Sequence, residues 1–454
     1  MSKLNIVILA AGQGTRMKSQ YPKVLHSLGG KPLLGHVIYT ARSLNPAKII
    51  VVYGHGGEQV PAALGSDDII WVEQAEQLGT GHAVEQAMPE IDDSSNLLIL
   101  YGDVPLLRDT TMAELVRIGE SGFGLLTVHL DDPAGYGRIV RDQHGAVTRI
   151  VEEKDASEQD RTITEINSGI MCTSAKQMRA WLSQLENDNA QKEYYLTDTI
   201  AMAVNDGVTV NTTHPETEQE VAGVNSRSQL AELERYFQRQ YAEQLMAAGV
   251  TLADPARLDI RGEVESGQDV TLDVNVVLIG KIKLGNNVSI GPGCVINNSV
   301  IGDNVVIKPM SVIEEAIIES GAIVGPFARL RPGAKLATDV HVGNFVEIKN
   351  SHIGKASKVN HLSYVGDTTM GADVNVGAGT ITANYDGANK HRTEIEDNAS
   401  VGSNSVLVAP VKVSKNATLG AGTILRKDAP EGELTLLATK QKTISGWKRP
   451  KKKS

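Results

Sequence analysis

The first half of the chain alternates short aliphatic runs with stretches of helical periodicity. Uninterrupted aliphatic runs of this length are typical of strands that are buried on both faces of a parallel sheet. They occupy residues 5–10, 48–53, 69–72 and 97–101. Amphipathic patterns at 81–88 and 111–120 predict helices between the strands. This alternation predicts a Rossmann-like, doubly wound α/β domain.

Strand patterns then follow one another without an intervening helix. They cover residues 125–130, 136–141, 146–151 and 166–172. Consecutive strands joined by short turns pair in antiparallel fashion, because a parallel pair needs a long crossover connection. We therefore expect an antiparallel section near the edge of the sheet.

One long helix is predicted after the α/β pattern. Residues 226–248 carry apolar side chains at helical spacing, Ser226 or Ser228 can cap the start, and Gly249 can end the helix. We expect three parts: an α/β domain at 1–225, a helical linker at 226–249 and a third part at 250–454.

The third part repeats one aliphatic side chain every six residues, with occasional steps of five. The repeated positions run from Leu278 to Ile313, from Val324 to Val376 and from Ile395 to Leu425. Such hexads predict a left-handed parallel β-helix, in which the repeated side chain points inward. The polar, turn-rich segment 382–393 interrupts the period and predicts a loop on a binding face.

Composition supports this division and excludes several classes of protein. Aromatic residues make up 4% of the 454 residues, and only five of them follow residue 250, where stacked hexads leave little room for rings. Two cysteines exclude a disulfide framework. No run approaches the roughly 18 apolar residues of a membrane span. The net charge of −10 argues against nucleic-acid binding, and the basic tail at 448–453 is typical of a solvated terminus. We expect a cytoplasmic protein without membrane or nucleic-acid partners.

A glycine-rich turn follows the first predicted strand. Gly12-Gln13-Gly14 could present backbone N–H groups to a phosphate. Met17 stands where a dinucleotide fingerprint needs its third glycine and where a Walker A motif needs the glycine before its lysine. Arg16 and Lys23 could neutralise a triphosphate or could be ordinary surface charges.

Asp103 follows the fourth aliphatic run. Ligands of open α/β sheets bind beyond the carboxyl ends of the strands, where a carboxylate is a natural Mg²⁺ ligand. A turn aspartate that bonds its own backbone is the alternative.

The hexad register places side chains of the third part. Arg331 and Lys349 each follow a repeat aliphatic and should stack one coil apart, roughly 5 Å. Such a pair either binds an anion or is solvated. A second column begins at His361 and continues through small residues for roughly 15 Å; these are Ala378, Ser403 and Ala421. A smooth column beside a histidine suits a pantetheine arm, although corners of a β-helix also prefer small residues.

Several ordered motifs resemble those of sugar-1-phosphate nucleotidyltransferases. They are Leu-Ala-Ala-Gly-x-Gly-Thr-Arg-Met from Leu9, Pro22-Lys23, Gln74 with Gly79-Thr80, and Tyr101-Gly102-Asp103. With the hexapeptide part, residues 3–450 resemble the bifunctional bacterial enzymes that join glucosamine-1-phosphate N-acetyltransferase to N-acetylglucosamine-1-phosphate uridylyltransferase. The resemblance implies acetyl transfer from acetyl-CoA, then Mg²⁺-dependent uridylyl transfer from UTP with release of pyrophosphate. It also implies a homotrimer and a role in supplying precursors of peptidoglycan and lipopolysaccharide.

The resemblance assigns roles to residues of the first part. UTP and the nucleotide sugar would contact Leu9, Ala10, Gly12, Lys23, Gln74, Gly79, Thr80, Tyr101, Gly102, Asp103, Gly137, Glu152, Asn167 and Asn225. Asp103 and Asn225 would hold Mg²⁺, and Arg16 would face the triphosphate.

The resemblance also assigns roles in the β-helix. His361 would be the general base that takes a proton from the glucosamine amine, and Glu347 would orient or polarise it. The sugar phosphate would contact Arg331, Lys349, Tyr364 and Asn375. Acetyl-CoA would contact Ala378, Asn384, Tyr385, Ser403, Ala421 and Lys440. The family usually has arginine near position 440, and lysine keeps the charge but loses the bidentate geometry.

Three other interpretations remain to be compared with the structure. A single-activity nucleotidyltransferase with a regulatory β-helix would need neither His361 nor the 382–393 loop. A γ-type carbonic anhydrase would need three converging histidines, and those of the β-helix show no close pair; they are His341, His352, His361 and His391. A non-enzymatic solenoid would show a regular exposed ladder, whereas the exposed positions here are mixed.

Overall fold

The computed structural model describes residues 3–54, 57–438 and 440–450. The chain forms two compact units, 1–237 and 238–454. The end of the basic tail, from residue 451, lies outside the described residues. None of the described helices is long and apolar enough to cross a membrane. The predicted domain boundaries at 225 and 249 stay a prediction.

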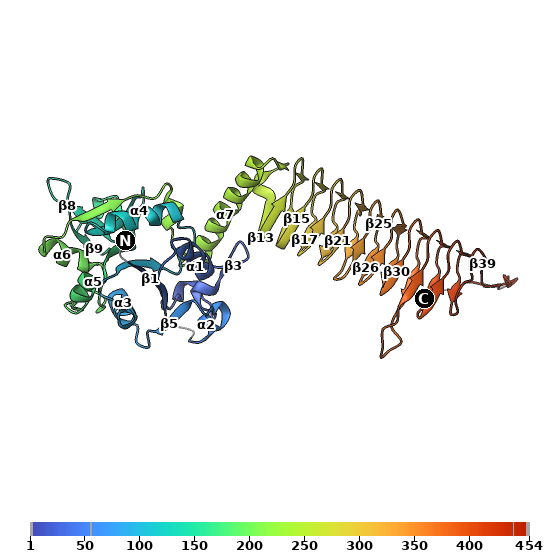
Figure 1. The fold of residues 1–454 in the computed structure, drawn as a ribbon, viewed down its shortest axis with the longest axis horizontal. Coiled ribbons are helices and arrows are strands. Elements are labelled where there is room, and N and C mark those ends of the chain that lie inside the picture. Colours follow the sequence, from blue (N-terminus) through green and yellow to red (C-terminus); the bar gives the residue numbers. More distant parts are fainter. Residues whose placement is uncertain (1–2, 55–56, 439, 451–454) are drawn as a thin grey trace. The chain divides into compact units, whose positions relative to one another are not determined.

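A mixed nine-stranded sheet forms unit 1 (Figure 1). Its strands run in the order β11-β7-β10-β6-β1-β4-β5, with β8 and β9 attached beside β10. Their bounds are β1 Leu4–Ala10, β4 Lys48–Tyr53, β5 Ile69–Glu73, β6 Asn96–Tyr101, β7 Phe123–His129, β8 Arg138–Arg141, β9 Val147–Val151, β10 Glu165–Ser174 and β11 Val210–Thr213. The four aliphatic runs are confirmed as parallel strands β1, β4, β5 and β6. The antiparallel section is also confirmed, and it extends further inward than the edge because β10 pairs with both β6 and β7.

Helices cover both faces of this sheet. They are α1 Leu33–Ser43, α2 Gln59–Leu64, α3 Thr80–Ala87, α4 Asp109–Gly119, α5 Ala175–Leu182 and α6 Asp198–Asn205. Short 3₁₀ turns (η1 Thr15–Met17, η2 Lys23–Leu25, η3 Met88–Glu90, η4 Asp160–Thr162 and η5 Glu218–Val221) and a small hairpin of β2 Ser27–Leu28 with β3 Lys31–Pro32 complete the unit.

Alternate residues of β1 belong to two different cores. Ile6 and Ile8 pack with α1 and α4, whereas Val7 and Leu9 pack with α3, α5 and α6. Successive side chains of a strand point to opposite faces, so one continuous aliphatic run serves both cores. This explains why the strand sequence does not alternate with polar residues, and it confirms the doubly wound architecture.

The predicted long helix is α7 Arg227–Ala247. The Ser226 Oγ accepts the backbone N–H of Gln229 at 3.2 Å, and Gly249 adopts φ +98° two residues after the helix ends. Both ends therefore use the expected residues. The division between the two units falls within this helix.

Short parallel strands stack coil upon coil through unit 2 (Figure 1). One wall contains β12 Thr251–Leu252, β14 Thr271–Leu272, β16 Ser289–Ile290, β19 Val306–Ile307, β22 Ile323–Val324, β25 His341–Asn344, β28 Lys358–His361, β31 Asn375–Val376, β34 Ser400–Val401, β37 Thr418–Leu419 and β39 Leu434–Thr435. The remaining strands are β13 Leu258–Ser266, β15 Val276–Leu284, β17 Val295–Asn297, β18 Val300–Ile301, β20 Val312–Glu314, β21 Ile317–Ile318, β23 Arg329–Leu330, β24 Lys335–Leu336, β26 Glu347–Lys349, β27 His352–Ile353, β29 Tyr364–Gly366, β30 Thr368–Met370, β32 Ile381–Ala383, β33 Thr393–Ile395, β35 Val406–Val408, β36 Val411–Val413 and β38 Ile424–Leu425. A 3₁₀ turn, η6 Pro255–Arg257, precedes β13.

The repeated side chains fill the interior of this parallel β-helix. Leu330, Val342 and Ile348 are fully buried. Ile318 and Thr382 also occupy inward positions, although the sequence pattern skipped the first and placed the second in the loop. Segment 382–393 leaves the stack as a hairpin, seen in the orange part of Figure 1, with Tyr385 paired to Lys390. The hexapeptide interpretation is therefore confirmed.

Candidate functional site

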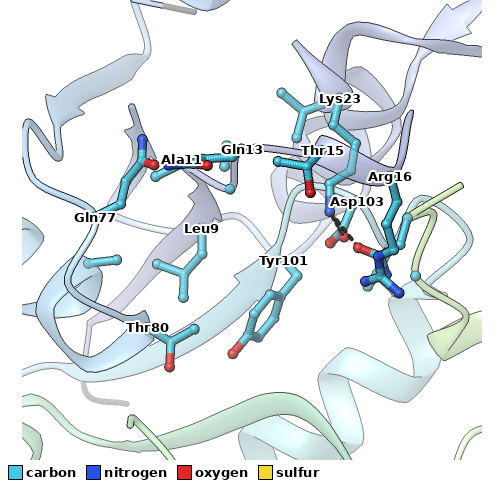
Figure 2. A pocket seen from close by; sticks show the side chains of 18 of the residues that line it. Leu9, Ala11, Gln13, Thr15, Arg16, Lys23, Gln77, Thr80, Tyr101 and Asp103 are labelled. Carbon is cyan, nitrogen blue, oxygen red and sulfur yellow. Dashed lines mark hydrogen bonds and ion pairs between the residues drawn. The ribbon is translucent and has the colours of Figure 1, made fainter. Parts of the chain in front are cut away.

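A cavity of about 870 Å³ opens in unit 1 beyond the carboxyl ends of β1, β5 and β6. Residues from distant parts of the chain converge on it because the parallel strands end at one edge of the sheet. Most of the predicted nucleotide ligands line this cavity: Leu9, Ala10, Gly12, Arg16, Lys23, Gln74, Gly79, Thr80, Tyr101, Asp103 and Asn225. Figure 2 shows Arg16, Lys23 and Asp103 on one side and Thr80 and Gln77 on the other, with Tyr101 between them and the turn at Ala11, Gln13 and Thr15 running across the view.

The glycine turn borders the end of the cavity that holds Arg16 and Lys23. Gly14 has φ +61°, and a Cβ there would lie 2.8 Å from the Cβ of Lys23. Gly12 faces open space, because a Cβ there would meet nothing within 4 Å. A side chain at Gly14 would therefore push Lys23 away, whereas Gly12 leaves the entrance free for a bulky ligand.

The Lys23 ammonium lies between two oxygen donors. Its Nζ is 2.5 Å from Asp103 Oδ2 and donates to Asn225 Oδ1 at 2.9 Å. Both members of the ion pair are largely buried, and Figure 2 shows Arg16 beside them. A carboxylate and an amide oxygen that already share one cationic group are donors of the kind that Mg²⁺ prefers. The residues predicted to hold Mg²⁺ therefore fit that ion.

The opposite end of the cavity holds the buried Gln74 amide. Its Nε2 donates to the Gly79 carbonyl at 3.1 Å and lies 3.0 Å from His82 Nδ1. Gly79 has φ +115°, and a Cβ there would lie 2.6 Å from the Tyr194 carbonyl oxygen. Gln74 is thus held in one orientation. His82 was not predicted as part of this site, although it lies on the first turn of α3, two residues after the predicted Thr80.

Four predicted residues do not line the cavity; they are Gly102, Gly137, Glu152 and Asn167. Three of them form a group at its margin. The Asn167 backbone N–H donates to the Gly137 carbonyl at 2.8 Å, and a Cβ on Gly137 would lie 3.4 Å from the Glu152 carboxylate oxygens. Burial raises the pKa of Glu152, although a hydrogen bond from Thr197 at 2.9 Å opposes the shift.

The stacked cations of the β-helix, Arg331 and Lys349, have neighbours that were not predicted. The backbone N–H of Arg331 donates to the Ile348 carbonyl at 2.8 Å, so Arg331 and Lys349 occupy the expected register. The Arg331 guanidinium, however, donates to the Glu347 carboxylate at 2.8 Å. Lys349 instead faces Lys390 of the hairpin, and it lowers the pKa of Lys390. Lys390 was missed because its position depends on how the loop folds back.

His361 ends β28, and its column is confirmed. The residue after each member of the column donates its backbone N–H to the carbonyl of the member one coil earlier. The bonds run from Gly379 to His361 at 3.1 Å, from Asn404 to Ala378 at 2.7 Å and from Gly422 to Ser403 at 2.8 Å. The structure adds Asn344 below the histidine, in direct register with it. Asn344 Oδ1 lies 2.8 Å from His361 Nδ1.

The other predicted residues of this region are spread around the coil. Tyr364 lies directly above Glu347, and the buried Asn384 donates to the Asp367 carboxylate. Tyr385 is exposed on the hairpin. Asn375 lies three residues before Ala378, which places it about 10 Å along the wall from the His361 column. Lys440 is exposed in the tail that follows β39.

Fold and cavity together define a nucleotide-transferring domain. The family model of the "MobA-like NTP transferase domain" matches residues 6–248, slightly more than half of the chain.

Curated relatives match nearly the whole chain. The bifunctional protein GlmU of Thiobacillus denitrificans is 59% identical over 449 residues, which cover 99% of this chain and 98% of the relative. Those of Ralstonia nicotianae and Idiomarina loihiensis are each 56% identical, with 99% of both chains covered. The chain belongs to the family of bifunctional GlmU proteins.

Proposed function

We propose that this chain makes UDP-N-acetylglucosamine by two transfers at separate sites. The β-helix transfers acetyl from acetyl-CoA to glucosamine-1-phosphate. Unit 1 then transfers uridylyl from UTP to N-acetylglucosamine-1-phosphate and releases pyrophosphate. The observation that carries the proposal is that each unit holds its own set of groups: Lys23 between Asp103 and Asn225 in one, and His361 below a smooth column in the other. The product would supply precursors for peptidoglycan and lipopolysaccharide, and we propose a cytoplasmic location because UTP and acetyl-CoA are available there.

In uridylyl transfer the residues of unit 1 bind UTP and neutralise the charge of its triphosphate. Arg16 and Lys23 hold the triphosphate above the glycine turn, and Gln74 orients the uracil. Asp103 and Asn225 would hold Mg²⁺, which would supply charge neutralisation at the phosphates when bound. An oxygen of the sugar phosphate attacks the α-phosphorus in line, and the bond to the pyrophosphate oxygen breaks. Positioning and charge neutralisation suffice for this step, and no covalent nucleophile is required.

In acetyl transfer His361 acts as the general base. The glucosamine amine attacks the thioester carbonyl carbon while the imidazole takes one of its protons. The carbon–sulfur bond then breaks, and coenzyme A leaves with a free thiol. Lys349, Lys390 and Arg331 hold the sugar phosphate. The Ala378–Ser403–Ala421 column lies against the pantetheine arm, while Asn384 and Tyr385 border the acetyl group.

The two sites are tested by measuring free thiol and pyrophosphate separately. His361→Ala should lose thiol release by about 10²–10⁴-fold, the usual contribution of a general base. It should still release pyrophosphate from UTP and N-acetylglucosamine-1-phosphate. Asp103→Ala should show the reverse pattern. If either substitution removed both activities from folded protein, the two-site proposal would be wrong.

We further propose that the chain assembles as a homotrimer around the β-helix. Four apolar side chains are at least half-exposed at one corner, one coil apart; they are Met310, Phe327, Phe345 and Leu362. The rings of Phe327 and Phe345 stack at 5.2 Å. A continuous apolar ladder of this kind favours coverage by another chain. Leu362 directly follows His361, so a second copy at this corner would border the acetyl-transfer site and could contribute the distant Asn375.

A further inference from the structure

The catalytic histidine of the proposed acetyl-transfer site has a neighbour that the resemblance did not assign. Asn344 lies one coil below His361 in the same column, with its Oδ1 2.8 Å from the imidazole Nδ1. An amide oxygen accepts hydrogen bonds and does not donate them. This contact therefore requires a proton on Nδ1 of the neutral imidazole, which leaves the lone pair on Nε2.

The backbone holds this contact in place. Along this wall the described strands β14, β16, β19, β22, β31, β34, β37 and β39 are two residues long. β25 and β28 extend to four residues, and the additional pairing ends on Asn344 and His361. A Cβ on Gly343 would lie 2.0 Å from the Asn360 carbonyl oxygen, so only glycine allows this close approach beside the pair. This longer pairing fixes the backbone positions of both residues.

We propose that Asn344 is a positioning residue that fixes the tautomer and orientation of His361. This inference rests on the proposed acetyl-transfer function and deepens it. With Nδ1–H directed at Asn344, the basic Nε2 points away from the coil below and toward the substrate amine. Without the amide, both tautomers and several ring orientations become populated, and only a fraction of the molecules carries a base in the productive geometry.

Substitution of Asn344 should change kcat for acetyl transfer and leave substrate binding nearly unchanged. Asn344→Ala should lower kcat for thiol release by about tenfold, a part of the 10²–10⁴-fold that a general base contributes. KM for acetyl-CoA and for glucosamine-1-phosphate should change less than twofold, because Asn344 lies below the base rather than against the substrates. Asn344→Asp should restore most of kcat, since a carboxylate also accepts from Nδ1–H. The acid limb of its pH–activity profile should shift to higher pH. A carboxylate beside the imidazole stabilises the protonated ring, so a higher pH is needed to obtain the neutral base.

The neighbouring histidine limits which pH changes can be attributed to His361. His341 lies on the same strand as Asn344, and burial together with Lys308 and Lys358 lowers its pKa. His341→Gln removes this second titrating group. In the His341→Gln background, Asn344→Asp should still shift the pH–activity profile of thiol release by the same amount as it does in the unchanged protein.

The decisive control is the double variant. In His361→Ala, the further change Asn344→Ala should leave the residual thiol release unchanged, because there is no base left to position. Pyrophosphate release by unit 1 should stay at the level of the unchanged chain. An equal loss from Asn344→Ala with and without His361, or no restoration by aspartate, would overturn the inference. Full activity of His361→Ala would instead overturn the proposed function, so the two failures are distinguishable.

Discussion

Lys23 contacts two residues that are 80 and 202 positions away in the sequence. The motif predicted a cation near a phosphate. It did not predict that the ammonium would bridge Asp103 and Asn225, because that contact depends on η2, the loop after β6 and the segment before α7 meeting at one place. The ammonium competes with a metal ion for the same oxygens, so a ligand that draws Lys23 toward its phosphates also frees the donors.

Glu152 shows the cost of a buried carboxylate at a binding site. Its pKa is raised above the value of an unfolded chain, first by burial and then by Asp198, Asp155 and Glu193, so ionisation disfavours the folded state. Stability from this group is therefore complete below the unfolded pKa and decreases as pH rises through the folded pKa.

Glu152→Gln should accordingly stabilise unit 1 more at pH 7.5 than in acid, because ionisation of the Glu152 carboxyl group disfavours the folded state. We expect a rise in Tm of about 2 °C, as for a gain somewhat below 1 kcal/mol in a domain of this size. The difference from the unchanged protein should disappear below about pH 4.5, near the unfolded pKa, because both side chains are then neutral. Thermal unfolding at both pH values measures it. The exposed Glu114→Gln is the control and should gain nothing; an equal gain at both pH values would contradict the explanation.

Each coil of the β-helix depends on one inward side chain per wall. In β21, Ile318 points inward and is 1% exposed, whereas its neighbour Ile317 points outward and is 45% exposed. The two residues are chemically identical and share one strand, so they isolate the effect of burial. The predicted series of repeat positions stopped at Ile313 and resumed at Val324, and the structure places Ile318 between them in the continuous core.

Ile318→Ala should lower the free energy of unfolding by about 2–5 kcal/mol, since it leaves a cavity in a packed interior. Ile317→Ala should cost less than 1 kcal/mol, because its side chain already contacts solvent. Urea unfolding followed by circular dichroism compares the two variants. Costs of similar size would mean that the outward face of this wall is covered in solution, and would argue against the assigned register.

At the scale of the whole molecule, a single chain leaves the apolar ladder of Met310, Phe327, Phe345 and Leu362 exposed to solvent. Static light scattering after size exclusion should give three times the mass of the 48.6 kDa chain. Replacing both Phe327 and Phe345 by serine should weaken the trimer and lower thiol release while preserving pyrophosphate release. Tyr39→Ser removes an exposed ring from unit 1 and should change neither mass nor activity. An active monomer of the unchanged chain would contradict the trimer.

Periodic features of the chain were predictable from the sequence for a local reason. A strand or a hexad repeats the same environment, so the type of side chain at each position already reports which way it points. The aliphatic strands, α7, the β-helix and the His361 column all follow from such patterns. Asn344 was also accessible in this way, because it lies one coil, 17 residues, before His361.

Specific contacts between side chains were decided only by the tertiary structure. Lys23 with Asp103 and Asn225, Arg331 with Glu347, and Lys349 with Lys390 each depend on placements accurate to about an ångström, because hydrogen bonds and ion pairs weaken steeply with geometry. Local patterns carry no information at that precision. The sequence by itself therefore determined the two architectures and most of the residues that line the cavity of unit 1, while the fold determined which side chains contact one another.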